Sequence, residues 1–328
     1  MIRNVMRRWR LSLALAVARF QPRFALRLAG VAPIAGGAVG ETHTGSLTDS
    51  LPKVIADARI VREYAGTYMK TCDVRKLTEG TGLSWHEISL AQLAAQDITE
   101  TTTNNNAQQI QDTIFSITPG MTQILIKITD RTYRRIADVV ESRMGPLAAN
   151  AMARKKDEDY LGTFSTFSTT ASPGTGTPLS FGHISAAVAN IGSNTTEPSS
   201  APIFSVLHGF QIYDIQAEIV SGVGTYTVPE GMSADVFRTG FRGTVTGSNV
   251  MEDGNITINA TPDARGATHS REAVVCVNGM TLKTETRRDP SFGGGADELF
   301  MTDEYGFGER SAGNWAYAHL SDATAPTS

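Results

Sequence analysis

The sequence predicts an α+β protein, and three observations carry this prediction. Apolar residues recur at helical spacing over 130–161, which predicts one long helix. Short strand-like runs lie on both sides of that helix and do not alternate with helices as in βαβ repeats. Of the 328 residues, 41% are hydrophobic and 19% are charged, which excludes a disordered or collagen-like chain. A chain of this length is expected to form about two domains.

Cysteine count and hydropathy exclude further classes. The two cysteines, Cys72 and Cys276, lie too far apart and are too few for a disulfide scaffold or a four-cysteine zinc site. We expect Cys276, inside the apolar run AVVCV, to be buried, whereas Cys72 is free to be exposed. No run of about 18 apolar residues occurs, so we expect no ordinary transmembrane helix.

Residues 1–40 form a basic segment that we do not expect to belong to the fold. The segment holds seven arginines and no acidic residue, so the rest of the chain carries a net charge of −11. A removed leader or an over-extended gene start, with the mature chain beginning near Glu41, is the favoured interpretation. A basic arm, a transit peptide and a secretory signal are the alternatives. After a polar stretch, Pro52 and the apolar spacing that follows predict a helix over 52–66.

Residues 71–128 read as a long β excursion. Strand-like runs at 72–77 and 83–90 flank a turn at 79–82, and runs at 113–118 and 121–128 are expected to pair about Pro119-Gly120. Residues 98–109 (ITETTTNNNAQQ) are too polar to build a core. A two-stranded ribbon is marginal in water, so the excursion is expected to pack on a neighbouring subunit. Ile114, Ile117, Ile124, Ile126 and Ile128 should hold it in place.

The helix over 130–161 is expected to be capped by Asp130 and interrupted at Gly145-Pro146. Its charged run at 154–159 (RKKDED) is expected to be a solvated face. A Ser/Thr/Gly-rich loop at 163–177 precedes a short helix at 183–191. A strand at 201–207, a helix at 210–219, and strand and turn at 240–250 follow. A buried strand at 271–277 and strand-like runs at 280–288, 298–304 and 313–320 close the chain.

No catalytic motif is present in the sequence. The phosphate-loop pattern, a complete dinucleotide fingerprint, a GxSxG elbow and a second histidine after His86-Glu87 at zincin spacing are all absent. His208 is expected to be a satisfied residue at a strand end. The paired carboxylates of Glu252-Asp253 and Asp303-Glu304 should point to opposite faces, which argues against an acid/base site. We therefore expect no enzyme, no cofactor and no metal site.

The order of these parts resembles the major capsid protein of tailed phages, the Hong Kong 97 coat fold, over about 41–322. Two stretches carry local similarity: PIFSVLHGFQIYDI at 202–215 is similar to a strand and helix of the family's axial domain, and EYGFGERSAGNWAYAHLSD at 304–322 is similar to its closing strands. The resemblance implies an N-arm and short helix at 41–70, an E-loop at 71–128, and a spine helix with peripheral domain at 129–200. It further implies a mainly axial domain at 201–270 and closing strands of the peripheral domain at 271–328.

The resemblance also implies an assembly function. Copies of the chain would form hexamers and pentamers of an icosahedral virion shell that encloses double-stranded DNA and is assembled in the host cytoplasm. Portal and scaffold proteins would be partners, and a membrane would not. Inter-subunit contacts are expected at Thr101, Asn104, Asn105 and Gln108 of the E-loop, and inner-wall basic groups at Arg131, Arg134, Arg135 and Arg143.

Some coats of the family crosslink through an E-loop lysine. The lysine available here is Lys76, which we expect to be an exposed strand residue without that role. Two alternatives to a phage coat stay open at this point. One is an encapsulin-type compartment with the same fold, and the other is an α+β enzyme or exported adhesin.

Overall fold

The computed structural model describes residues 66–327, apart from 102, 106, 136–137, 223–242 and 312. The basic segment and nearly all of the predicted helix at 52–66 lie outside these residues. The described chain forms two compact units. The smaller contains Leu125–Pro146 and Glu285–Phe300, and the larger contains the remaining described residues.

The elements alternate irregularly between helix and strand, as the α+β prediction requires. The helices are α2 (Tyr68–Thr71), α3 (Asp130–Tyr133), α4 (Asp138–Gly162), the 3-10 turn η3 (Thr163–Ser165), α5 (Phe181–Gly192) and α6 (Gly209–Gly222). The strands are β1 (Asp73–Lys76), β2 (Trp85–Leu90), β3 (Asp112–Ile117), β4 (Gly120–Thr129), β5 (Ile203–Leu207), β6 (Thr244–Val245), β7 (Ser248–Glu252), β8 (Asp263–Ser270), β9 (Val274–Asp289), β10 (Ala296–Glu309) and β11 (Ala316–Asp322).

The strands form a four-stranded sheet in the order β1-β9-β10-β4, a five-stranded sheet in the order β11-β8-β5-β7-β6, and the two-stranded hairpin β2-β3. The predicted strand runs at 72–77, 83–90, 113–118 and 121–128 are confirmed, but their predicted pairing is wrong. β1 pairs in parallel with β9, and β3 pairs with β2 rather than with β4. The Pro119-Gly120 turn therefore passes from the hairpin into the four-stranded sheet. A Pro-Gly signal predicts a turn at this point. It does not show whether the strands before and after the turn pair with each other or with other strands.

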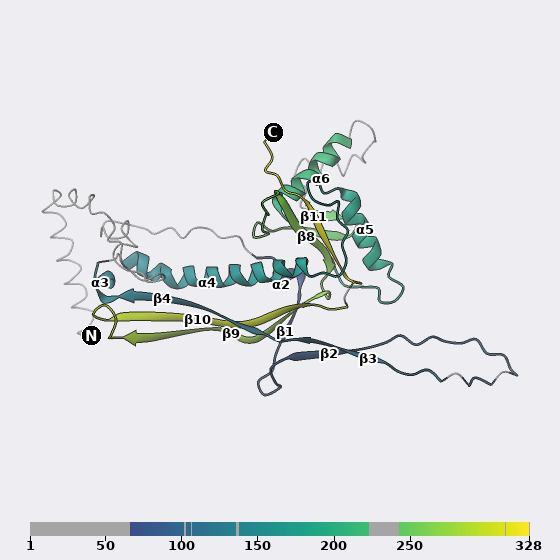
Figure 1. Cartoon of the computed structure of the whole chain (residues 1–328), viewed down its shortest axis with the longest axis horizontal. Helices are drawn as coiled ribbons and strands as arrows, with labels where there is room; N and C mark the ends of the chain where they lie inside the picture. Colours follow the sequence, from purple (N-terminus) through teal and green to yellow (C-terminus); the bar gives the residue numbers. More distant parts are fainter. Residues whose placement is uncertain are drawn as a thin grey trace, which may run out of the picture. The chain divides into compact units, whose positions relative to one another are not determined.

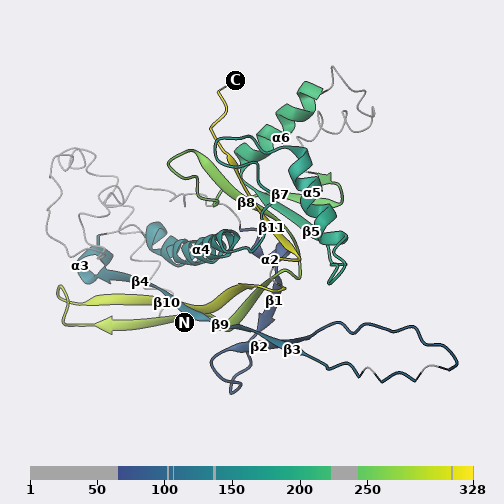
Figure 2. The same cartoon turned by 45° about the vertical axis from the view of Figure 1, so that its right-hand side comes forward.

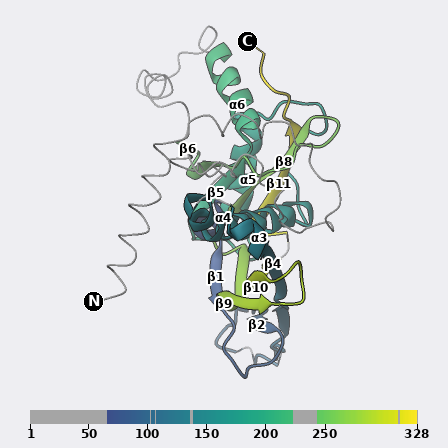
Figure 3. The same ribbon diagram turned by 90° about the vertical axis from the view of Figure 1, so that its left-hand side faces the viewer.

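The five-stranded sheet is the core of the larger unit (Figure 3). Its strand β8, which lies between β11 and β5, has the sequence DARGATHS and was not predicted, because its polar residues match no strand pattern. The polar side chains of β8 are buried and hydrogen-bonded. Thr268 exchanges a hydrogen bond of 2.7 Å with Ser205, and a second of 2.7 Å joins Thr268 to Nε2 of His319. Helix α5 packs against β8 and β11.

The long helix is interrupted at a different place from the predicted one. Helix α3 ends at Tyr133, and α4 begins at Asp138 and runs without interruption through Gly145 and Pro146. Pro146, which lacks a backbone N–H, is exposed. The N-cap of α3 is Thr129, not Asp130, because the Thr129 hydroxyl accepts from the backbone N–H of Thr132 at 3.3 Å.

Asp130 instead belongs to an ion-pair network of the smaller unit. Both of its carboxylate oxygens bind the Arg288 guanidinium, at 2.5 and 2.6 Å. Lys127 binds Asp289 at 2.9 Å and the nearly buried Glu298 at 3.0 Å. These pairs lower the pKa of the Asp130 carboxyl and raise the pKa of the Lys127 amine, chiefly through the hydrogen bonds that hold the charged forms.

The charged run of α4 is only partly a solvated face. Lys155 pairs with Asp159 at 2.5 Å on the exposed side, as predicted. Lys156 and Asp157 are buried, with 7% and 0% of their surface exposed. The Lys156 amine donates to Asn278 Oδ1 at 2.7 Å and pairs with Asp303 at 3.1 Å. The helix turns these two residues toward the core because Tyr160 and Phe164, one and two turns on, pack into the same cluster.

Candidate assembly surface

The hairpin β2-β3 is the part of the larger unit with the least burial. The strands pair antiparallel from Trp85↔Ile117 to Leu90↔Asp112 and continue into the connection 91–111 (Figures 1 and 2). Every described residue from Ile88 to Ile114 is exposed. The large apolar side chains in this stretch are 59% to 68% exposed: Ile88, Leu90, Leu93, Ile98, Ile110 and Ile114.

This exposure corrects one expectation. Ile114 was expected to pack and hold the ribbon, but it is 66% exposed and lies opposite the equally exposed Ile88. Ile117 was expected to pack and does so, with 6% exposed. Ile124, Ile126 and Ile128 are half-buried in β4, which belongs to the four-stranded sheet and not to the ribbon.

The four polar residues predicted to contact a neighbour lie in the connection between the strands. Thr101, Asn104, Asn105 and Gln108 are all exposed. Gln108 is also structural within the loop, since its amide oxygen accepts from the backbone N–H of Ala94 at 2.8 Å and its amide nitrogen donates to the Ala94 carbonyl. The Gln108 side chain therefore ties the two arms of the loop together.

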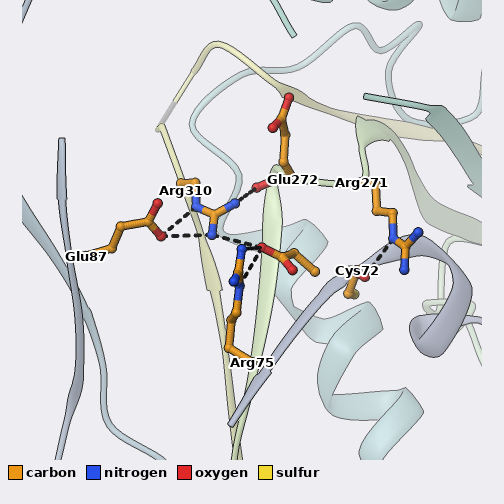
Figure 4. Close-up of polar contacts among 7 residues, drawn as sticks. Cys72, Arg75, Glu87, Arg271, Glu272 and Arg310 are labelled. Carbon is orange, nitrogen blue, oxygen red and sulfur yellow. Dashed lines mark hydrogen bonds and ion pairs between the residues drawn. The ribbon is translucent and has the colours of Figure 1, made fainter. Parts of the chain in front are cut away.

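The base of the hairpin is held by one arginine (Figure 4). Arg310 follows β10, and its Nη2 lies 2.8 Å from Glu87 of β2 and 3.0 Å from Asp73 of β1. Its Nη1 donates to the Glu272 carbonyl at 2.9 Å, beside the start of β9. Arg310 is 12% exposed. A planar guanidinium has donors in several directions, so this side chain joins β2 to β1 and the β8–β9 turn.

Two glycines of β10 form the seat on which β3 packs. A Cβ on Gly306 would lie 2.9 Å from Ile117 Cγ2, and a Cβ on Gly308 would lie 2.9 Å from Ile117 Cδ1 and 3.0 Å from the Phe115 ring. Ile117 is thereby buried against Val275 and Val277 of β9. Phe115 also meets Trp85 edge-on at 6.3 Å between ring centroids. The close approach of β3 thus explains why glycine follows each aromatic residue in YGFG at 305–308.

Similarity to solved structures decides the fold. A search by sequence finds no matching family model and no matching characterised protein. By structure, the chain is similar to a capsid structure of cyanophage P-SCSP1u, with a TM-score of 0.63, 14% identity, and 89% of this chain and 98% of the other covered. The capsid of Ralstonia phage GP4 matches with a TM-score of 0.62 at 11% identity, covering 84% and 97%. A structure from Mycobacterium phage Che8 gives 0.65 at 15%, covering 82% and 96%.

The chain has the fold of phage capsid proteins. The predicted Hong Kong 97-like α+β fold is confirmed, since the chain covers nearly the whole length of each of these structures. The predicted division into N-arm, E-loop, spine helix and peripheral and axial domains stays a prediction.

The four arginines predicted to line the inner wall belong to the smaller unit. Arg131, Arg134, Arg135 and Arg143 are all exposed. The positive charge of Arg134 contributes to lowering the pKa of Asp130, so this arginine faces the first turn of α3.

The remaining residues that the sequence analysis considered are Lys76, His208 and the two cysteines. Lys76 is exposed at the end of β1, as predicted. His208 follows β5 and accepts from the backbone N–H of Phe210 at 3.2 Å, also as predicted. Cys276 is buried, and so is Cys72, which corrects the expectation that Cys72 is free to be exposed. Burial raises the pKa of both thiols.

The described residues contain neither a cluster of metal-binding side chains nor a helix that could span a membrane. Among residues 66–327 as described, no group of three or more His, Cys, Asp or Glu side chains is placed to hold a metal ion. No helix in the described part of the chain is long and apolar enough to cross a membrane. Sequence reasoning missed one functional arrangement, the Arg310 contact with Glu87 and Asp73, because no spacing rule connects such distant positions.

Proposed function

We propose that this chain is the major capsid protein of a tailed double-stranded DNA phage, and that its copies assemble through the β2-β3 hairpin into hexamers and pentamers of an icosahedral shell. The observation that carries the proposal is the row of exposed apolar side chains on a hairpin with a rigid base. The similarity to capsid structures of cyanophage P-SCSP1u and Ralstonia phage GP4 supports it.

The energetics of the hairpin favour a partner of the same kind. An isolated two-stranded ribbon is marginal in water, and the outer half of this one gains nothing from the core of its own unit. Burying an exposed Leu or Ile side chain contributes about 1.5 to 3 kcal/mol. Side chains such as Ile88, Leu90 and Ile114 would then supply several kcal/mol to each contact between copies, before the cost of association.

The base and the tip of the hairpin have different roles in the proposed assembly. Arg310 and the glycine seat fix its base to the subunit, so the direction of the ribbon is set before a neighbour arrives. The tip carries neutral polar groups, including Thr101, Asn104 and Asn105, which can bond to different neighbours in rings of six and five. A closed shell needs only a few such contacts, each repeated many times.

The charge distribution agrees with a container for DNA. Residues 41–328 carry a net charge of −11, so we propose that the wall holds DNA only loosely and without sequence preference. Arg131, Arg134, Arg135 and Arg143 are the groups proposed to face it. We further propose that portal and scaffold proteins are partners, that the shell is assembled in the host cytoplasm, and that the chain performs no catalysis.

The experiment that tests the proposal compares the full-length chain with a variant whose residues 98–109 are replaced by a short Gly/Ser turn. Light scattering after size-exclusion chromatography and negative-stain microscopy report the assembly state. We expect shells or rings from the parent chain and folded single subunits from the variant. Shells that form equally well from the variant would refute the role of the hairpin's tip, and shells that also form from Ile114→Asp would refute the role of its exposed apolar side chains. Shells that co-purify with an enzyme in place of DNA would identify an encapsulin-type compartment.

A further inference from the structure

A buried threonine lies between two carboxyl groups at the point where the described chain begins. The backbone N–H of Thr67 donates to Asp157 Oδ1 of α4 at 2.8 Å, and the Thr67 hydroxyl donates to Asp253 Oδ2, just after β7, at 2.8 Å. Both aspartates are fully buried, and Thr67 is 6% exposed. All three residues belong to the larger unit.

Two neighbours complete this arrangement. Asn255 binds both acids, because its backbone N–H donates to Asp253 Oδ1 at 3.0 Å and its side-chain amide donates to Asp157 Oδ2 at 2.9 Å. Gly66 packs so closely that a Cβ there would lie 2.5 Å from Asp157 Oδ1. The chain is therefore held at Gly66-Thr67 by Asp157 of α4 and by Asp253 just after β7, which lie 96 positions apart in sequence.

Two carboxyl groups in one buried site cannot both ionise at low cost. Burial, and after it the negative charge of Asp157, raises the pKa of Asp253 to about 7, against the hydrogen bonds from Asn255 and Thr67 that favour its charged form. Asp253 therefore carries its proton below about pH 7 and is half ionised near that pH. Loss of the proton leaves a negative charge buried beside the Asp157 side chain.

The other titratable groups around the pair keep their charge in this pH range. Tyr68 has its pKa raised to about 12 by burial, and Cys276 has its pKa raised to about 11. Burial also raises the pKa values of Cys72 and Tyr160 well above their usual range. From α4 and β10, Lys156 and Asp303 are paired with each other, 3.1 Å apart. Between pH 5 and 7 the change of charge in this cluster therefore belongs to Asp253.

We propose that Asp157 and Asp253 form a pH-sensitive clasp on Thr67, closed while Asp253 carries its proton and weakened as that proton is lost. Opening would loosen Gly66–Thr71, the first described segment of the chain. The carboxyl O–H bond of Asp253 breaks and its proton goes to solvent; no other covalent bond changes. The inference concerns this cluster alone and does not depend on the proposed capsid function.

The test is amide hydrogen exchange of the full-length chain, read by mass spectrometry on peptides that cover 66–72 and corrected for the intrinsic pH dependence of exchange. Between pH 5 and 7 we expect the protection of this segment to fall about 50-fold and then to level off, because Asp253 keeps its proton up to about pH 7 in the closed state but has an ordinary pKa of about 3.9 in the open state. Peptides from β8 should not show this fall as the pH rises. Constant protection of 66–72 would overturn the proposal.

Variants assign the effect to the pair. Asp253→Asn supplies a permanent N–H in place of the acid proton, so its protection should stay constant with pH. The matched control is Asp214→Asn, which removes another acid whose pKa is raised, to about 6, and which should leave the fall unchanged. A fall that persists in Asp253→Asn, or disappears in Asp214→Asn, would overturn the clasp.

A third variant keeps the proposal testable if Asp253→Asn does not fold. Thr67→Val removes the hydroxyl that favours the charged form of Asp253. The fall in protection should then continue to a higher pH before it levels off. Levelling off at the same pH in Thr67→Val would contradict the proposal.

Discussion

Arg310 and Glu87 lie 223 positions apart, yet Nε of the arginine donates to the glutamate carboxylate at 2.9 Å. This contact fixes the base of the β2-β3 hairpin to the end of β10. Arg310 also binds Asp73 and the Glu272 carbonyl, so its loss would take this donor from Glu87 and the Glu272 carbonyl, while Asp73 keeps Arg75.

Replacing Arg310 by alanine should therefore destabilise the subunit. We expect a loss of about 2 kcal/mol in the free energy of unfolding, because the partners are partly buried. The matched control is Arg75→Ala, since Arg75 also binds Asp73, at 2.9 Å, but is 53% exposed. Its loss should be below about 0.5 kcal/mol. Urea unfolding measures both, and equal losses would contradict the role given to Arg310.

The glycine seat of β10 gives a second prediction. Gly308→Val should cost about 1 to 3 kcal/mol, because its side chain would overlap Ile117 and Phe115. Gly120→Val in β4 is the control, since a Cβ at Gly120 meets nothing within 4 Å. Thermal unfolding of the two variants decides the matter, and a Gly308→Val chain as stable as the control would show that the hairpin does not pack as described.

The two isoleucines of β3 separate folding from assembly. Ile114→Asp should leave the free energy of unfolding within about 0.5 kcal/mol of the parent, because the side chain is exposed, and should abolish shell formation. Ile117→Asp should unfold the subunit, because it buries a charge without a partner. Circular dichroism and light scattering distinguish the two. An Ile114→Asp chain that assembles normally would show that the exposed apolar side chains of the hairpin are not needed for assembly.

Buried histidines predict a dependence of stability on pH. Burial lowers the pKa of His319 to about 4, so its folded form is neutral where the unfolded form already binds a proton. The folded state thus loses stability as pH falls from about 6.5 through 4, by about 3 kcal/mol between pH 7.5 and 4. In His319→Gln this contribution should be absent. Urea unfolding at several pH values measures the difference between the two chains, and a difference that stays constant with pH would refute the prediction.

Local patterns predicted most of the elements. The helices at 181–192 and 209–222 and the strand at 203–207 follow directly from apolar spacing and flanking turns. Strand β8 could not be predicted in this way. Its buried Thr268 and His269 are compensated by partners far away in sequence, among them Ser205 and Tyr160. A polar residue reads as exposed until its hydrogen-bond partner is known.

The sequence predicted a long β excursion with a polar tip, but it did not predict the exposed apolar side chains of the hairpin. The polar tip at 98–109 was recognisable because it cannot build a core. Apolar periodicity predicts that Ile114 packs, since apolar side chains normally point inward. In the structure β3 pairs with β2 rather than β4, and Ile114 lies exposed opposite Ile88. Pairing depends on contacts distant in sequence, and the Arg310 contact with Glu87 escaped prediction for the same reason.

The central claim is that copies of this chain build a closed shell through the β2-β3 hairpin. Negative-stain microscopy of the expressed full-length chain tests it most directly. The account predicts uniform closed shells, or rings of six and five subunits, from the parent chain. A monodisperse, stable monomer under all assembly conditions would contradict it.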